Sequence, residues 1–213
     1  MISLNDVSVL ASALRLRLGE RRMPRSTDPQ HRSIVVVDIV GYGRRDDLAQ
    51  VRARATLDRV VRTAFHASGM PWHRLVTKDR GDGMIVLIPP TMSKAALLHP
   101  LIPRLSVLLH NLNGRDRQDR ELRVRIAVHA GEVVQGPYGW IGTDVNVACR
   151  LVDSALLRQE LIRRPQAELV LIVSEAIHLA VIRHGHRGVD PAAYRPVSIS
   201  IKEGSTPAWL YNH

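Results

Sequence analysis

Apolar and polar positions follow two different periods along the chain, and these periods predict strands and helices in turn. Residues 33–40 are β-branched and apolar apart from one acid, which predicts a buried central strand. Residues 46–69 carry apolar side chains three and four positions apart and end at a glycine, which predicts a helix with a glycine cap. Residues 122–130 alternate strictly, which predicts a half-buried strand with Arg125 and His129 on its wet face.

Shorter patterns supply the other elements. Residues 73–77 and 84–88 predict two strands joined by a turn-rich hairpin connection. Residues 92–112 have a helical pattern that Pro100 and Pro103 interrupt, which predicts a kink or two shorter helices. The remaining elements are predicted in this order: a helix from Thr143 or Asp144, a strand over 169–173, a helix over 174–184, and strands over 197–201 and 208–211.

This order of elements contains hairpins as well as crossovers. The mixture predicts an α+β fold, in which a largely antiparallel, ferredoxin-like sheet carries helices on one face. It excludes a doubly wound dinucleotide fold, and the sequence has neither a G-x-G-x-x-G after the first strand nor a Walker A motif. We expect an N-terminal helix and flexible arm over residues 1–32, and one domain over residues 33–213 that ends in a C-terminal β extension.

Charge and composition limit the partners. Thirty Lys and Arg against twenty Asp and Glu give a formal charge of +10, so the surface should attract polyanions. A basic nucleic-acid-binding domain is therefore one alternative, although one Phe, three Trp and four Tyr leave few side chains for stacking on bases. The longest apolar runs are far shorter than the roughly 20 residues of a membrane span. A single cysteine, Cys149, excludes an internal disulfide framework, so we expect a cytoplasmic protein without a membrane partner.

Four side chains are candidates for chemistry. Asp38 is an acid in the middle of a predicted strand, and Asp82 lies at the tip of the predicted hairpin, so adjacent strands would bring the two together. Paired carboxylates repel each other and favour a divalent cation; the alternative is a strand-end acid bonded to backbone amides beside an ordinary turn aspartate. Asn146 and Arg150 share one face of a predicted helix. Such a pair suits contact with a polyphosphate or belongs to solvated surface.

Four segments, taken in order, resemble the catalytic domain of class III nucleotidyl (adenylate and guanylate) cyclases. They are Val37-Asp38-Ile39-Val40-Gly41-Tyr42, Arg80-Gly81-Asp82-Gly83, Arg123-Val124-Arg125-Ile126-Ala127-Val128-His129-Ala130-Gly131-Glu132 and Val145-Asn146-Val147-Ala148-Cys149-Arg150-Leu151. The resemblance implies a homodimer or pseudo-twofold dimer with active sites at its interface. It implies that Asp38, Asp82 and the backbone carbonyl of Ile39 hold two Mg²⁺ or Mn²⁺ ions per site. Asn146 and Arg150 would then come from the other subunit, to position the ribose and stabilise the transition state.

The reaction implied by the resemblance is attack of a ribose 3′-hydroxyl on the α-phosphate of a nucleoside triphosphate, which yields a 3′,5′-cyclic nucleotide and pyrophosphate. Lys78 matches the lysine that reads adenine in adenylate cyclases, but Gly139 stands where its acidic partner is expected. The base is therefore open between ATP and a pyrimidine nucleotide, read by Lys78, Thr143 or Asp144 in a rearranged pocket.

The chain is also similar to bacterial class III-like cyclases that make cyclic UMP or cyclic CMP in anti-phage signalling. The incomplete base-reading pair leaves a second alternative, a pseudocyclase that binds nucleotide as a regulatory module without turnover.

Overall fold

The computed structural model describes residues 28–115, 121–201 and 204–212, and most of the helix and arm predicted for residues 1–32 lie outside these ranges. The described chain is built on an eight-stranded sheet in the order β2-β3-β1-β4-β6-β8-β7, with β5 paired to β4. The strands are β1 Gln30–Ile39, β2 Val76–Asp79, β3 Gly83–Ile88, β4 Val124–Gly136, β5 Gly139–Ile141, β6 Leu169–Ser174, β7 Tyr194–Ile201 and β8 Gly204–Tyr211. Among these strands every pairing is antiparallel except that of β4 with β6.

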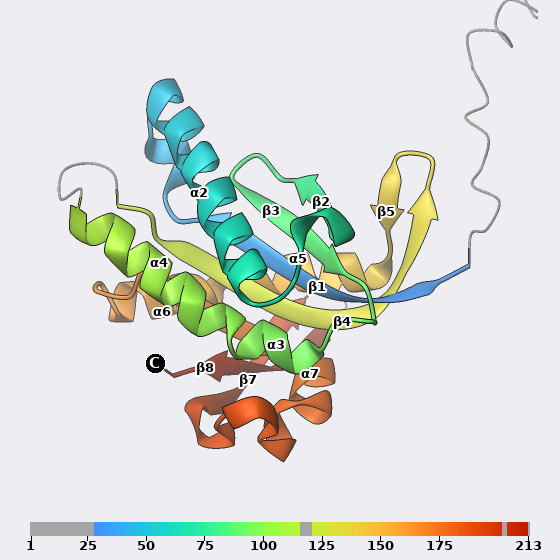
Figure 1. Ribbon diagram of the computed structural model, residues 1–213. Helices are drawn as coiled ribbons and strands as arrows, with labels where there is room; N and C mark the ends of the chain where they lie inside the picture. The colour runs from blue at the N-terminus through green and yellow to red at the C-terminus, as the bar shows by residue number, and fades with distance from the viewer. Residues whose placement is uncertain (1–27, 116–120, 202–203, 213) are drawn as a thin grey trace, which may run out of the picture.

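Helices pack on the two faces of this sheet (Figure 1). The helices are α2 Asp47–Ala67, α3 Lys94–Leu98, α4 Leu101–Arg115, α5 Thr143–Val152, α6 Ala155–Arg163 and α7 Glu175–Ala180. Short 3-10 turns are η1 Tyr42–Arg44, η2 Trp72–Arg74, η3 Ile182–His184, η4 His186–Gly188 and η5 Pro191–Ala193. Within the described ranges, no helix is long and apolar enough to cross a membrane.

Two separate apolar cores follow from the alternation of side chains along β1. Val35 and Val37 face a core shared with α2, α3, α4 and α7, whereas Ile34 and Val36 face a core shared with α5 and α6. The predicted α+β class with a mostly antiparallel sheet is confirmed. The structure adds helices on the second face, and the continuous apolar run of β1 requires them because both of its faces need cover.

The prediction of a wet face on β4 is wrong. His129 is only 7% exposed, and the Arg125 side chain is only 12% exposed. Both lie under α5 and have acidic partners there, Asp38 for Arg125 and Asp144 for His129. The polar positions of the alternating pattern therefore mark buried side chains with acidic partners instead of contact with solvent, because a buried polar group is tolerated where it is hydrogen-bonded.

Local signals account for the boundaries of the helices on the first face. The Asp46 side chain accepts a hydrogen bond from the backbone N–H of Ala49 (2.8 Å) and caps α2. Gly69, with φ of 77°, follows its end. The predicted interruption of the next helix is confirmed, because α3 ends at Leu98 and α4 starts after Pro100.

Candidate active site

Asp38 is a buried acid near the end of β1, and its side chain is 1% exposed. Arg125 stands directly opposite on β4 and donates to Oδ2 of Asp38 from Nε (2.9 Å) and from Nη2. Oδ1 of Asp38 is buried and receives no hydrogen bond from the described residues. A buried oxygen left without a donor requires an explanation, and binding of a cation is one that suits a carboxylate.

The β2–β3 hairpin brings Asp82 beside Asp38. Gly83 pairs with Asp38, and a Cβ atom at Gly83 would lie 2.1 Å from the carbonyl oxygen of Val37. Only glycine allows this close approach. The backbone N–H of Ile39 donates to the carbonyl oxygen of Asp82 (2.9 Å). The hairpin is thus fixed against β1, and Asp38 and Asp82 lie next to each other, as the sequence predicts.

Burial raises the pKa of Asp38 to about 6. The Arg125 guanidinium opposes this shift, whereas the charge of Asp82 and a hydrogen bond that only a protonated carboxyl can make to Asp82 add to it. The folded protein therefore holds a proton on Asp38 more tightly than the unfolded chain does. By linkage, ionisation of Asp38 lowers the free energy of unfolding as the pH rises from 3.8 to about 6.

This linkage gives a prediction for stability. As the pH rises from 3.8 to about 6, we expect the free energy of unfolding of the wild type to fall relative to that of the Asp38→Asn variant. The difference between the two proteins should change by up to about 3 kcal/mol in favour of the variant. Asparagine keeps the shape of the side chain and an acceptor for Arg125 but has no proton to lose. Urea unfolding followed by circular dichroism across this pH range measures the difference. Parallel profiles for the two proteins would contradict the prediction.

Two ion pairs hold the hairpin in place from either side. Arg54 of α2 pairs with Asp79 (2.8 Å), and Arg80 pairs with Asp153 at the end of α5 (3.0 Å). Each pair is partly exposed, so its contribution to stability is small. Their effect is positional: the hairpin that carries Asp82 is attached to both helical layers.

Asn146 and Arg150 lie one turn apart on α5. Asn146 is exposed and Arg150 is half-buried, while Val145, Ala148 and Val152 on the same helix enter the core. The sequence predicts the start of this helix at Thr143 or Asp144, and α5 begins at Thr143. The structure places the two side chains on one helix, and their action on a nucleotide stays a prediction.

The start of α5 is fixed to β4 by Asp144. Its carboxylate accepts a hydrogen bond from the backbone N–H of Glu132 (2.6 Å) and pairs with Nε2 of His129 (3.1 Å). A Cβ atom at Gly131 would lie 2.0 Å from Oδ2 of Asp144. Glycine is therefore required at position 131 so that α5, with Asn146 on it, can sit against β4 in this register.

Substitution of Gly131 tests this anchor. We expect Gly131→Ala to displace the Asp144 carboxylate and lower the free energy of unfolding by about 2 kcal/mol. Gly114→Ala on α4 is the matched control, because a Cβ atom there meets no other atom within 4 Å, and alanine favours a helix by up to about 1 kcal/mol. Urea unfolding of the two variants measures the contrast. Equal stability for both would contradict the proposed anchor.

A cavity of about 170 Å³ lies between the β2–β3 hairpin and the β4–β5 arm. Thr77, Lys78, Tyr138 and Trp140 contribute to its wall. Of the three side chains predicted to read the base, Lys78 lines this cavity, whereas Thr143 and Asp144 do not. The sequence did not predict the position of Trp140 in this wall, because no recognisable motif surrounds that residue. The role of all three candidates in base recognition stays a prediction.

The donor set around Asp38 and Asp82 suits a divalent cation that is shared with a ligand. In the described ranges no cluster of three or more His, Cys, Asp or Glu side chains is arranged to hold a metal ion. Two carboxylates, one with a buried oxygen that lacks a donor, fit Mg²⁺ or Mn²⁺, because such ions keep several water or phosphate oxygens as ligands. Sequence reasoning also missed Arg125, whose signal was its place in the alternation of residues 122–130.

The sequence matches no family model and no curated protein. Solved structures share its fold. The guanylyl cyclase Cya2 superposes with a TM-score of 0.60 at 15% identity over 87% of this chain and 92% of that one. An adenylate/guanylate cyclase/hydrolase from Silicibacter pomeroyi gives 0.63 at 17% identity over 87% and 98%. A bacterial light-regulated adenylyl cyclase gives 0.64 at 16% identity over 98% of this chain and 64% of that one. The chain therefore has the fold of class III cyclase catalytic domains.

Proposed function

We propose that this protein is a nucleotidyl cyclase, which converts a nucleoside triphosphate into a 3′,5′-cyclic nucleotide and pyrophosphate at the interface of a homodimer. The observation that carries the proposal is the adjacency of Asp38 and Asp82. Burial and the neighbouring charge of Asp82 make ionisation of Asp38 unfavourable, so the fold gains no stability from placing two acids together. A pair of this kind is characteristic of functional sites, and solved structures with the same fold are adenylyl and guanylyl cyclases.

Asp38, Asp82 and the carbonyl of Ile39 would hold two Mg²⁺ or Mn²⁺ ions. When bound, the ions lower the pKa of the 3′-hydroxyl and neutralise charge on the phosphates. Arg125 binds one oxygen of Asp38 and so fixes the plane of the carboxylate, which leaves the other oxygen for a ligand. In this role Arg125 is a positioning residue.

Asn146 and Arg150 would act on the nucleotide bound to the opposite subunit. The amide of Asn146 would position the ribose, and the guanidinium of Arg150 would stabilise negative charge at the α-phosphate in the transition state. Large apolar side chains near the start of α5 support a dimer: Tyr138 is 86% exposed and Ile141 is 57% exposed. A second copy of the chain would cover them.

The reaction itself tests the proposal. Purified protein incubated with Mn²⁺ and each of ATP, GTP, CTP and UTP is expected to form a cyclic nucleotide from at least one of them, together with an equal amount of pyrophosphate. Chromatography of the nucleotides and an enzymatic pyrophosphate assay measure both products. The absence of cyclic product from all four, or its persistence in Asp82→Asn, would refute the proposal.

The preferred base is ATP or a pyrimidine nucleotide. Lys78 lines the cavity of about 170 Å³ beside the hairpin, while Gly139 stands where adenylate cyclases have an acid. The same screen decides between them. The product would serve as a cytoplasmic signal, in anti-phage defence if the base is a pyrimidine.

A second candidate is a pseudocyclase that binds nucleotide without turnover. The ion pair between Arg125 and Asp38 favours it, because the guanidinium already neutralises one of the two acids. Stoichiometric binding of a nucleoside triphosphate without any product, from a protein that is dimeric, would support this candidate over the enzyme.

A further inference from the structure

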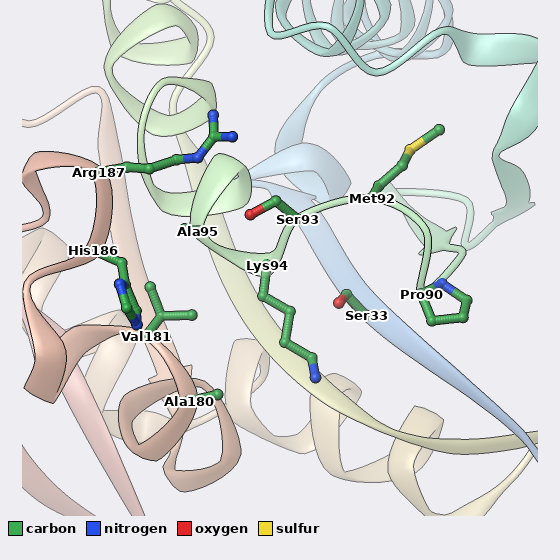
Figure 2. A pocket seen from close by; sticks show the side chains of 10 residues that line it. All are labelled: Ser33, Pro90, Met92, Ser93, Lys94, Ala95, Ala180, Val181, His186 and Arg187. Carbon is green, nitrogen blue, oxygen red and sulfur yellow. The ribbon is translucent and has the colours of Figure 1, made fainter.

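A cavity of about 460 Å³ lies on the face of the sheet opposite α5. Figure 2 shows its parts: Ser93 and Lys94 at the start of α3, His186 and Arg187 of η4 across from them, and Ser33 on β1 beyond Lys94, on the side of Pro90 and Met92. The two walls come from segments far apart in the sequence, which the sheet brings together.

This cavity is separate from the proposed active site. Ser33 and Asp38 are five residues apart on the extended strand β1, which corresponds to roughly 17 Å. Their side chains also point to opposite faces, since residues at odd and even positions of β1 enter different cores. A ligand in this cavity would therefore not touch the paired acids.

The charged side chains that line the cavity are basic. Lys94, His186 and Arg187 contribute to it, and no acidic residue does. With other described residues, none of these three side chains forms an ion pair or a hydrogen bond; His186 only contacts the ring of His184, at 5.4 Å between centroids. Cationic groups that surround a cavity without a counter-charge attract an anion.

The backbone of Arg187 gives a second, independent observation. Its φ of 55° and ψ of 35° are left-handed, and within the described chain it is the one residue other than glycine with positive φ. Gly185 (φ 63°) and Gly188 (φ 73°) flank it. A bulky residue is strained in this region, and such strain is concentrated at ligand sites and switches. The turn directs the Arg187 side chain towards α3, across the cavity (Figure 2).

The volume and the rest of the lining indicate the class of ligand. A cavity of this size accommodates a small organic molecule. Met92, Ala95 and Val181 give it an apolar part beside the cations. Guanidinium and ammonium groups together suit phosphate, to which arginine donates two parallel hydrogen bonds. We propose that this cavity binds a small organic phosphate, with Lys94 and Arg187 supplying the positive charge that attracts the phosphate and with the organic part against the apolar wall.

The test is calorimetric titration of the full chain with AMP and, separately, with inorganic phosphate. Four proteins are compared: the wild type, Lys94→Gln/Arg187→Asn, Arg59→Gln/Arg158→Gln and Asp38→Asn. Asparagine at position 187 removes the charge and tolerates the left-handed backbone. Arg59 and Arg158 are exposed on α2 and α6 and lie outside the cavity lining, so their double variant removes the same charge elsewhere.

We expect the wild type to bind AMP more tightly than inorganic phosphate, and Lys94→Gln/Arg187→Asn to weaken the binding of AMP at least about tenfold. The Arg59→Gln/Arg158→Gln control and Asp38→Asn are expected to bind within about twofold of the wild type. Equal weakening in both double variants would reduce the effect to net charge and overturn the proposal. Loss of AMP binding in Asp38→Asn alone would assign the binding to the paired acids and would also overturn the proposal. The proposal would equally be overturned if the wild type did not bind AMP, or if it bound AMP and inorganic phosphate with equal affinity. Because no arm measures turnover, this test is independent of the proposed cyclase activity.

Discussion

Asp38→Asn is expected to lower the rate of cyclic nucleotide formation by about a thousandfold, which corresponds to roughly 4 kcal/mol in the activation free energy. Asparagine is nearly isosteric with aspartate and still accepts a hydrogen bond from Arg125. It lacks the negative charge that makes the pair with Asp82 attractive to a divalent cation. The loss would therefore come from the charge and not from a change in the fold. Initial rates at saturating nucleotide and Mn²⁺ measure it.

Asp79→Asn is the matched control for this experiment. Asp79 lies on the same hairpin but is exposed and pairs with Arg54, and its Oδ1 accepts the backbone N–H of Gly81 (3.0 Å), which asparagine can also do. We expect its rate to stay within about twofold of the wild type. Titration with Mn²⁺ gives a readout besides activity, since Asp38→Asn should lose binding that Asp79→Asn retains. Similar rates for the two variants would remove Asp38 from the proposed mechanism.

Elements with local causes were predictable from the sequence. The helix over residues 46–69 has an N-cap acid, a regular apolar stripe and a terminal glycine, and α2 follows that pattern closely. The hairpin between β2 and β3 has the turn residues that such connections need. The proximity of Asp38 and Asp82 followed from placing the hairpin beside the central strand. Each of these features depends on residues close in sequence or on one pairing of neighbouring strands.

The features that the sequence did not predict depend on distant pairings. Arg125 meets Asp38 because β1 and β4 pair in one particular register, and no local pattern determines that register. The alternation of residues 122–130 separated the two faces of β4 but did not indicate that α5 covers the second one. The cationic cavity likewise joins Lys94 to Arg187, which only the assembled sheet brings together.

Arg150→Ala tests whether the site is formed by two subunits, because a subunit that carries Asp38→Asn should restore activity to it in a mixed dimer. Alone, Arg150→Ala is expected to lower the rate by about a hundredfold, and Asp38→Asn is expected to be nearly inactive. If each site takes its acids from one subunit and Arg150 from the other, a mixed dimer of the two variants contains one site with both defects and one intact site. Random exchange of equal amounts makes half of the dimers mixed, so the mixture should recover about a quarter of the wild-type rate.

The control for complementation is a mixture of Asp38→Asn with Asp82→Asn. Both variants damage the acids, so in a mixed dimer each site keeps one damaged acid and no activity should return. Initial rates after co-refolding, with dimer content measured by light scattering, distinguish the two mixtures. Failure of the Asp38→Asn and Arg150→Ala mixture to recover activity, in a protein whose wild type is an active dimer, would place the acids and Arg150 of each site in the same subunit. Recovery in that mixture alone would mean that each catalytic site forms between two chains, because one variant lacks the acid of Asp38 and the other lacks the guanidinium of Arg150.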